Sequence, residues 1–461
     1  MKAGLGRLLV VVLAAGAGTR MRSSRPKVLH ELAGRPLLEW VLETARSLGP
    51  DEIRVVTGIG GEEIRSRFSE SGIRFVEQPE PLGTAHAVGV AIADVADDPT
   101  VLVLYGDVPL LEPGDLGVLL EVANPSTLAL LTTERTDPAG YGRIVRDTQG
   151  QICRIVEEAD LPDDAMRLIH EVNTGILACS RHLLTLLLPR IGRRNAQGEF
   201  YLTDLVEEAL QAGIPVHNRL LQNPKKAQGV NSAFDLAAAE RVLQARQTES
   251  LMRQGVRIRD PARFDLRGWV EADTDVEIDI GVILEGRIRL GRGVRVGPYS
   301  VLRDVSLGEG TEVFSHCFLE GVETGNHVRI GPFARIRPST RLHHHARIGN
   351  FVEVKNSRLG DRSKANHLAY VGDAEIGDDV NLGAGVITVN YDGAEKHVTV
   401  IEDGVFVGCD SQLIAPVRIG RGSFIAAGST IVRDTPPDQL TLSRNDQKSI
   451  PHWKRPVKKK S

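Results

Sequence analysis

The stretch Arg329–Lys355, RIGPFARIRPSTRLHHHARIGNFVEVK, carries an aliphatic residue at every sixth position. These residues are Ile330, Ile336, Leu342, Ile348 and Val354. Helical periodicity, which would repeat apolar side chains about every 3.6 residues, is absent here. Hexapeptide repeats with one inward aliphatic residue in each short strand are typical of a left-handed parallel β-helix, whose stacked coils bury a continuous apolar column.

The same six-residue phase returns nearer the end of the chain, at Ile401, Val407, Leu413, Ile419, Ile425 and Ile431. Between Leu382 and Ile401 the period is interrupted, and the intervening segment Asn390–Lys396 is polar and turn-like. Insertions in solenoids form loops on one face and often carry binding residues. We therefore expect this loop to project toward a ligand or a neighbouring chain.

The first 230 or so residues alternate β-branched apolar runs with helical patterns. The sequence predicts strands at Leu8–Leu13, Ile53–Thr57, Val101–Leu104 and Thr127–Thr132, and helices at Leu37–Ser47, Thr84–Ile92 and Leu202–Ala212. This order indicates a Rossmann-like α/β domain around a mostly parallel sheet. In such a domain the ligand site lies at the carboxyl ends of the strands.

The segment from Asn231 to Gln254 is rich in Ala, Glu, Leu and Arg, with apolar residues at helical spacing and Gly255 as a stop. It predicts one long linking helix. A chain of 461 residues exceeds what one core usually organises. We therefore expect an α/β domain at 1–230, a linker helix at 231–254, and a β-helix domain with a C-terminal tail at 255–461.

Composition excludes several classes of function. The net charge is only -4 and aromatic residues make up 4% of the chain, so binding of nucleic acid is not expected. Four widely spaced cysteines without a CxxC pair indicate neither a disulfide framework nor a zinc site, which fits a cytoplasmic protein. No run approaches the roughly 20 apolar residues that span a bilayer, so no membrane insertion is expected.

A glycine-rich loop follows the first predicted strand, in the segment LAAGAGTRM (Leu13–Met21). Its glycines let the backbone approach phosphates closely, while Arg20 and Lys27 supply the positive charge that a triphosphate requires. A tight turn with solvated basic side chains is the alternative interpretation.

Two further motifs favour a nucleotide site. Leu82–Ala87 looks like a second loop that opens a helix, and Gln78 can read a base through its amide edge. Asp107 closes the strand Val101–Leu104, where a carboxylate is costly unless it is paired or bound to a cation. Asp107 is therefore a candidate magnesium ligand, and capping of the following turn is its alternative role.

The repeats contain a second set of polar residues. Arg337, Lys355 and Lys396 are separated along the chain, but stacked coils can bring them together around a phosphate monoester. A solvated basic face is the alternative. His367 lies beside Asn366 and Tyr370 in a polar break in the pattern.

Together with the loops above, the motifs PKVLH, EQPEPLGTAHA, YGDVPL, GYGRI, IVEEAD, NTGI and EFYLTD occur in order along the chain. The set resembles the bacterial family of bifunctional N-acetylglucosamine-1-phosphate uridyltransferases and glucosamine-1-phosphate N-acetyltransferases. For the first domain the resemblance implies a nucleotidyltransferase that binds UTP at Leu13, Ala14, Ala15, Gly16, Arg20, Lys27, Gln78, Gly83 and Thr84. It also implies a sugar-phosphate site at Gly142, Glu157, Asn173 and Asn231, and Mg²⁺ held by Asp107 and Asn231. One departure is Ala159, where many relatives carry lysine.

For the β-helix the resemblance implies an acetyl-CoA-dependent acetyltransferase, with His367 of the KANHLAY segment as the base. Glucosamine-1-phosphate would be bound by Arg337, Lys355, Tyr370, Asn381 and Lys396, and acetyl-CoA by Ala384, Asn390, Tyr391, Cys409, Ala427 and Arg444. Histidine suits this role because the substrate ammonium must lose a proton before it attacks a thioester. We expect direct transfer without an acyl-enzyme, although Cys409 stands where many relatives carry serine.

The family also implies a homotrimer with the acetyltransferase site between chains. Two other functions remain open: a monofunctional sugar-nucleotide pyrophosphorylase whose β-helix only trimerises, and a non-enzymatic scaffold. The run His343–His345 is interpreted as a solvated corner, because consecutive side chains do not converge on one metal ion. Lys458–Lys460 is interpreted as a mobile tail that could contact the anionic coenzyme.

Overall fold

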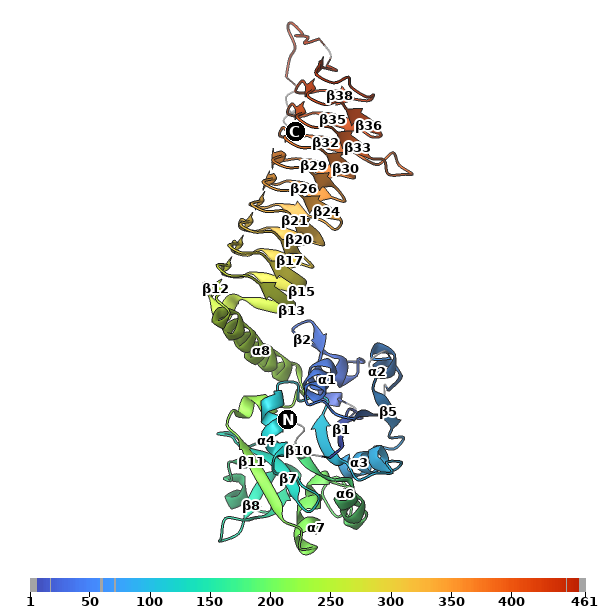
Figure 1. Cartoon of the computed structure of the whole chain (residues 1–461), viewed down its shortest axis with the longest axis vertical. Coiled ribbons are helices and arrows are strands. Elements are labelled where there is room, and N and C mark those ends of the chain that lie inside the picture. The colour runs from blue at the N-terminus through green and yellow to red at the C-terminus, as the bar shows by residue number, and fades with distance from the viewer. Residues whose placement is uncertain (1–5, 17, 59–60, 70–71, 445, 456–461) are drawn as a thin grey trace, which may run out of the picture. The chain divides into compact units, whose positions relative to one another are not determined.

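The computed structural model describes residues 6–16, 18–58, 61–69, 72–444 and 446–455, which divide into two compact units after Leu243 (Figure 1). The predicted tail Lys458–Lys460 lies outside the described residues. None of the described helices is both long and apolar enough to cross a membrane.

The first unit is built on a sheet in which β1 (Leu8–Leu13) is an interior strand. All six residues of β1 are buried, as expected of a strand covered on both faces. β1 pairs in parallel with β4 (Glu52–Thr57) and β6 (Thr100–Tyr105), and β5 (Arg74–Glu77) continues the sheet beyond β4. The carboxyl ends of these strands meet at one edge, where the predicted loops lie.

The other half of this sheet is mixed rather than parallel. β10 (Glu171–Ser180) runs antiparallel between β6 and β7 (Leu128–Glu134), and β11 (Val216–Leu221) lies parallel to β7. β7 and β10 are joined through the hairpin of β8 (Arg143–Arg146) and β9 (Ile152–Val156) rather than through a crossover helix. Parallel neighbours need a long crossover connection, and none joins β7 to β10. These two strands therefore pair in the antiparallel direction.

Helices cover both faces of the sheet, and two apolar clusters form the core of this unit (Figure 1). The predicted helices are present: α1 (Leu37–Ser47) and α3 (Thr84–Ile92) have the expected bounds, and α7 (Leu205–Gln211) begins after a 3-10 turn at Leu202–Asp204. The remaining helices are α2 (Gly61–Arg67), α4 (Pro113–Leu120), α5 (Asp164–Arg167) and α6 (Arg181–Leu187).

The long helix expected at Asn231–Gln254 is present as α8 (Ala233–Arg253). Its residues Ala239 and Leu243 belong to an apolar cluster of the first unit, together with Leu37. Its residue Leu251 belongs to the core of the second unit. The division of the chain therefore falls inside this helix.

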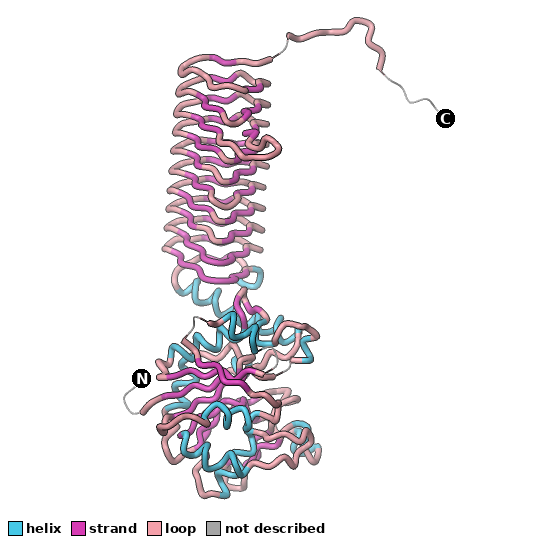
Figure 2. The backbone as a smooth tube through the Cα atoms, turned by 90° about the vertical axis from the view of Figure 1, so that its right-hand side faces the viewer, coloured by secondary structure: helices cyan, strands magenta, loops and turns pink. Residues whose placement is uncertain are grey.

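The second unit is a left-handed parallel β-helix, drawn as stacked coils in Figures 1 and 2. One sheet contains β12 (Arg257–Ile258), β14 (Glu277–Ile278), β16 (Arg295–Val296), β19 (Glu312–Val313), β22 (Arg329–Ile330), β25 (Arg347–Asn350), β28 (Lys364–His367), β31 (Asn381–Leu382), β34 (Phe406–Val407), β37 (Phe424–Ile425) and β39 (Leu440–Thr441). The other runs from β13 (Asp265–Ala272) to β38 (Thr430–Ile431) and includes β23 (Arg335–Ile336), β26 (Glu353–Lys355), β29 (Tyr370–Gly372), β32 (Ile387–Val389), β33 (Thr399–Ile401) and β35 (Gln412–Ile414).

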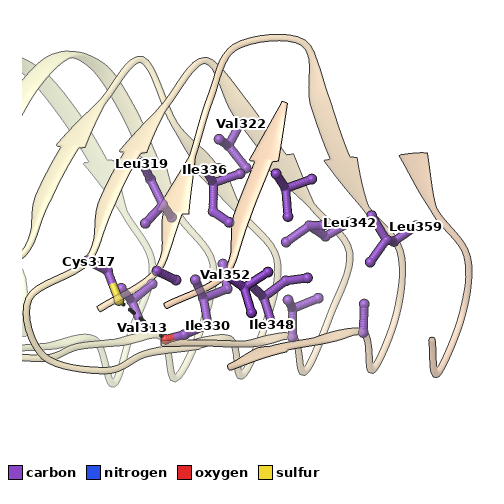
Figure 3. Close-up of a cluster of buried hydrophobic side chains, with 14 of the residues drawn as sticks. Val313, Cys317, Leu319, Val322, Ile330, Ile336, Leu342, Ile348, Val352 and Leu359 are labelled. Carbon is purple, nitrogen blue, oxygen red and sulfur yellow. Dashed lines mark hydrogen bonds between the residues drawn. The ribbon is translucent and has the colours of Figure 1, made fainter. Parts of the chain in front are cut away.

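The hexapeptide aliphatic residues fill the inside of the coils (Figure 3). The parallel pairs Ile330↔Ile348 and Ile336↔Val354 stack residues three hexads apart, and all four side chains are at most 2% exposed. Cys317 is also buried in this column. Burial raises the pKa of its thiol to about 11, so the side chain stays neutral and packs like an apolar residue.

The interruption of the hexapeptide period is shorter than the sequence indicated. Thr388, six residues after Leu382, is fully buried at the next inward position of β32. Its hydroxyl donates to the Gly372 carbonyl at 2.9 Å and accepts from the Gly372 amide at 2.7 Å. A polar residue thus fills an inward position because its hydroxyl is fully hydrogen-bonded, and the insertion itself lies between Val389 and Thr399.

Candidate active sites

The glycine-rich loop packs against the turn that carries Lys27. Gly18 adopts φ of +60°, and a Cβ added there would lie 2.7 Å from Lys27 Cβ. Glycine is therefore needed for both conformation and space. The chain leaves the end of β1 through Leu13, Ala14, Ala15 and Gly16. The Ala14 amide donates to the Val56 carbonyl of β4 at 2.9 Å. Arg20 is exposed beside this loop, in the 3-10 turn Thr19–Met21.

Lys27, Asp107 and Asn231 come together in the first unit. The Lys27 ammonium donates to Asp107 Oδ2, and it donates to Asn231 Oδ1 at 3.0 Å. The Lys27 and Asp107 side chains are each 14% exposed. The two side-chain oxygens predicted to bind metal thus converge on one cation, the Lys27 ammonium. Hard oxygen donors of this kind suit Mg²⁺.

Substrate must complete any metal site here. Among the described residues no group of three or more His, Cys, Asp and Glu side chains is arranged to hold a metal ion. Mg²⁺ commonly takes one or two protein oxygens and fills its octahedron with phosphate oxygens and water. The pair formed by Asp107 and Asn231 fits that pattern. The Val230 amide donates to the Asp107 carbonyl at 2.8 Å and so fixes Asn231 next to the end of β6.

The residues predicted to contact the uridine, Gln78, Gly83 and Thr84, lie around the start of α3. The Gln78 side chain is buried, and its Nε2 donates to the Gly83 carbonyl at 3.1 Å and contacts His86 Nδ1 at 3.0 Å. These contacts leave Oε1 as the acceptor end of the carboxamide. Gly83 has φ of +112°, and a Cβ there would lie 2.5 Å from the Phe200 carbonyl oxygen. The Thr84 hydroxyl accepts from the Leu202 amide at 3.0 Å.

Of the predicted sugar-phosphate residues, Gly142 precedes β8, Glu157 follows β9 and Asn173 lies in β10, whereas Asn231 lies beside Lys27. The Asn173 amide donates to the Gly142 carbonyl at 2.9 Å, and a Cβ on Gly142 would lie 3.3 Å from Glu157 Cδ. Burial, and to a smaller degree the Asp160 charge, raises the pKa of Glu157. Next to Ala159, where many relatives carry lysine, the Glu158 carboxylate accepts a hydrogen bond from Arg143 at 2.7 Å. Three of the four predicted residues, Gly142, Glu157 and Asn173, thus lie close together, and their role in sugar-phosphate binding stays a prediction.

The basic residues of the β-helix also meet. The sheet register places Arg337 one coil before Lys355. Lys355 and Lys396 lie in contact: that contact raises the pKa of Lys355 and lowers that of Lys396. Tyr370 begins β29, which pairs with β26, and lies opposite Glu353 in that pair.

Two carboxylates at this site were not predicted from the sequence. Glu353 accepts from Arg337 at 3.0 Å, and Asp373 lies 3.4 Å from the Lys355 ammonium. In the sequence these residues look like ordinary polar positions of the repeat. Only the stacking of coils shows that they face the predicted basic residues.

Three of the predicted acetyl-CoA residues, Ala384, Cys409 and Ala427, form a column with His367 along the β-helix. The pairs Ala365↔Leu382, Leu382↔Val407 and Val407↔Ile425 fix the register of four consecutive coils. Two residues further on in each coil stand His367, Ala384, Cys409 and Ala427. His367, Cys409 and Ala427 are exposed, and a Cβ on Gly428 would lie 3.6 Å from Arg444 Cδ. Asn381 lies earlier in β31 and pairs with Lys364.

The inserted loop Asn390–Lys396 is a small ordered turn, closed by a bridge between Tyr391 and Lys396. Asp392 accepts from the amides of Ala394 and Glu395 at 2.8 and 2.7 Å. Tyr391 is exposed, whereas Asn390 is buried and donates from Nδ2 to Asp373.

The run His343–His345 does not converge on one point. His343 Nε2 accepts from Arg358 at 2.9 Å, and His344 Nδ1 accepts from the Asn326 amide at 3.0 Å. His345 stacks on His327 with ring centroids 5.2 Å apart. Each ring therefore has its own partner.

Comparison with known proteins gives consistent matches to both units. The family model for the MobA-like NTP transferase domain matches residues 10–172, and that for the bacterial transferase hexapeptide matches residues 399–433. The "Bifunctional protein GlmU" of Alkalilimnicola ehrlichii is 52% identical over 97% of this chain and 96% of its own length. Those of Nitrosospira multiformis and Ralstonia nicotianae are 51% and 49% identical, over 99% and 98% of this chain and 99% of their own lengths.

Proposed function

The chain belongs to the bifunctional GlmU family, and we propose how its two units divide the reactions of UDP-N-acetylglucosamine synthesis. The β-helix transfers an acetyl group from acetyl-CoA to glucosamine-1-phosphate. The α/β unit then transfers uridylyl from UTP to N-acetylglucosamine-1-phosphate and releases pyrophosphate. The observation that carries this division is that Lys27, Asp107 and Asn231 converge in one unit, while His367 and Ala384 stack in the other.

In the α/β unit the reaction needs positioning and charge neutralisation rather than a general base. The sugar phosphate is already ionised and attacks the α-phosphorus of UTP directly. Lys27 and Arg20 bind the phosphates, and Gln78 Oε1 accepts a hydrogen bond from the base. Asp107 and Asn231 would hold Mg²⁺, which supplies further positive charge at the triphosphate. Gly142, Glu157 and Asn173 bind the sugar phosphate.

In the β-helix the amine must be deprotonated before it attacks. His367 accepts the proton from the substrate ammonium, and the amine then adds to the thioester carbonyl. The Ala384 amide, in the next coil beside His367, stabilises the oxyanion until CoA leaves, and the second proton of the attacking amine ends on the CoA thiol. Arg337, Lys355, Tyr370, Asn381 and Lys396 bind glucosamine-1-phosphate. Asn390, Tyr391, Cys409, Ala427 and Arg444 bind acetyl-CoA.

The chain acts on small-molecule substrates and assembles with copies of itself, and we propose a homotrimer with the acetyltransferase site between chains. An exposed corner column of the β-helix supports this. Phe333 and Phe351 stack with centroids 5.2 Å apart, and Leu368 follows in the next coil. Exposed apolar patches commonly mark protein interfaces. A cytoplasmic location is supported by the four cysteines, all of which are free.

One experiment tests the proposed function. The protein is given glucosamine-1-phosphate, acetyl-CoA, UTP and Mg²⁺ together, and the products are separated. We expect UDP-N-acetylglucosamine, free CoA and pyrophosphate. Nucleotide transfer to N-acetylglucosamine-1-phosphate without any release of CoA would identify a monofunctional pyrophosphorylase instead.

A fragment that ends at Arg253 should retain uridylyl transfer and lose acetylation. The apolar clusters of the first unit are complete within it, including Ala239 and Leu243 of α8. Pyrophosphate release and UTP binding measure the retained activity. A folded fragment that bound no UTP would contradict the assignment of the loop from Gly16 to Lys27.

Cys409→Ser should keep most of the acetyl transfer. A thiol nucleophile needs a nearby cation or base to lower its pKa, yet the neighbouring residues are Gly408 and Asp410. Mass spectrometry of enzyme quenched during turnover should show no acetyl adduct. A kinetically competent acetyl-Cys409, together with an inactive serine variant, would overturn direct transfer.

A further inference from the structure

Asp373 is a buried carboxylate at the centre of the acetyltransferase residues, and the proposed mechanism gives it no role. It follows β29 with φ of +49°, and its side chain is 8% exposed. Its amide donates to the Lys355 carbonyl at 3.0 Å, and its carbonyl accepts from the Thr399 amide at 3.1 Å. A carboxylate in such a place is costly unless its charge is compensated.

Three donors from different parts of the β-helix meet this carboxylate. Oδ1 accepts from Asn356 Nδ2 at 2.6 Å. Oδ2 accepts from Asn390 Nδ2, and the Lys355 ammonium lies 3.4 Å from it. Burial opposes ionisation, but the hydrogen bonds from the two asparagines and the Lys355 charge hold the pKa of Asp373 below its usual range. Asp373 is therefore an anion with satisfied oxygens.

These contacts have two consequences for the substrate site. Lys396 is a second cation close to Lys355, and the Asp373 carboxylate, 3.4 Å from the Lys355 ammonium, offsets part of the repulsion between the two charges. The bond from Asn390 Nδ2 also fixes the orientation of its carboxamide, with Oδ1 left as the acceptor end. One carboxylate thus orders a phosphate-binding lysine and the first residue of the inserted loop.

We propose that Asp373 is a positioning residue of the acetyltransferase site, which sets the Lys355 ammonium in place for glucosamine-1-phosphate and the Asn390 carboxamide in place for acetyl-CoA. This inference rests on the proposed function of the β-helix. Asp373 acts through Lys355 and Asn390 rather than on the reacting atoms. Its removal should therefore weaken substrate binding more than it slows the chemical step.

The test is Asp373→Asn in the full-length protein, which keeps the shape of the side chain but removes its charge and one acceptor. We expect KM for glucosamine-1-phosphate to rise about 10- to 100-fold, as for loss of a charge-assisted hydrogen bond. The turnover number should fall by no more than about threefold, because the transfer step itself keeps its residues. The rate of uridylyl transfer, which takes place in the other unit, should stay unchanged.

Asp379→Asn is the matched control. Asp379 lies on the same β-helix, and both its oxygens accept from Arg362 at 2.7 Å, but it is exposed to solvent. Its loss should leave KM for glucosamine-1-phosphate unchanged. An equal rise in both variants would show a general effect of charge and would overturn the proposal.

The remaining outcomes also support or overturn the positioning role of Asp373. If Asp373→Asn has a normal melting transition and an unchanged KM, the positioning role is wrong. If this variant fails to fold, Asn356→Ala takes its place, because it removes one donor and leaves the carboxylate; KM should then rise about threefold or more, and an unchanged KM would overturn the role. A wild-type chain that released no CoA would count against the proposed function itself.

Discussion

Asp107→Ala abolishes uridylyl transfer and leaves acetyl transfer near the wild-type rate. The reason is that Asp107 supplies the only full negative charge in the triad with Lys27 and Asn231. Without it, the site loses the carboxylate that we propose holds Mg²⁺ and the anion that orients Lys27. Loss of one electrostatic contact to the transferring group costs about 10²- to 10³-fold, and loss of the metal ligand adds to that cost.

The measurement is pyrophosphate release from UTP with N-acetylglucosamine-1-phosphate, beside CoA release in the same preparation. Removal of metal with EDTA should reproduce the effect on the wild type and spare acetylation. Asp115→Ala is a matched control, since Asp115 is also 14% exposed and pairs with Lys226 at 3.0 Å in the same unit. Equal loss of both activities in Asp107→Ala would contradict the two-site assignment.

His367→Ala should slow acetyl transfer by about 10² to 10⁴, the range of a positioned general base. His367 is exposed at the end of β28, so its truncation creates no cavity in the apolar column. The melting transition and uridylyl transfer should therefore be unchanged. The measurement is CoA release at saturating glucosamine-1-phosphate.

His343→Ala provides the comparison for His367, because His343 lies on the same β-helix and its ring accepts from Arg358 away from the predicted acetyltransferase residues. It should retain full acetyl transfer. Full turnover of His367→Ala at neutral pH would show that His367 has a structural role and that another group accepts the proton.

Local patterns in the sequence were sufficient for most of the fold. The six-residue period predicted the β-helix because each coil repeats the same local environment, with one aliphatic residue inward per strand. Buried β1 and the helices α1 and α3 were predicted with their observed bounds, since their apolar spacing matches one regular structure. The motifs also identified Lys27, Asp107 and His367 as candidate site residues, and their roles stay predictions.

The tertiary structure decided which of these residues meet. Lys27 and Asn231 are 204 residues apart and share one hydrogen bond, which no local pattern encodes. The antiparallel direction of β10 follows from the β8–β9 hairpin that precedes it in the chain. Thr388 can occupy an inward position because its hydroxyl forms hydrogen bonds with Gly372 in the preceding coil. Asp373 looks like an ordinary turn residue in the sequence. Its contacts with Lys355, Asn356 and Asn390 exist only because stacked coils bring distant polar groups into one buried place, where each must find a partner.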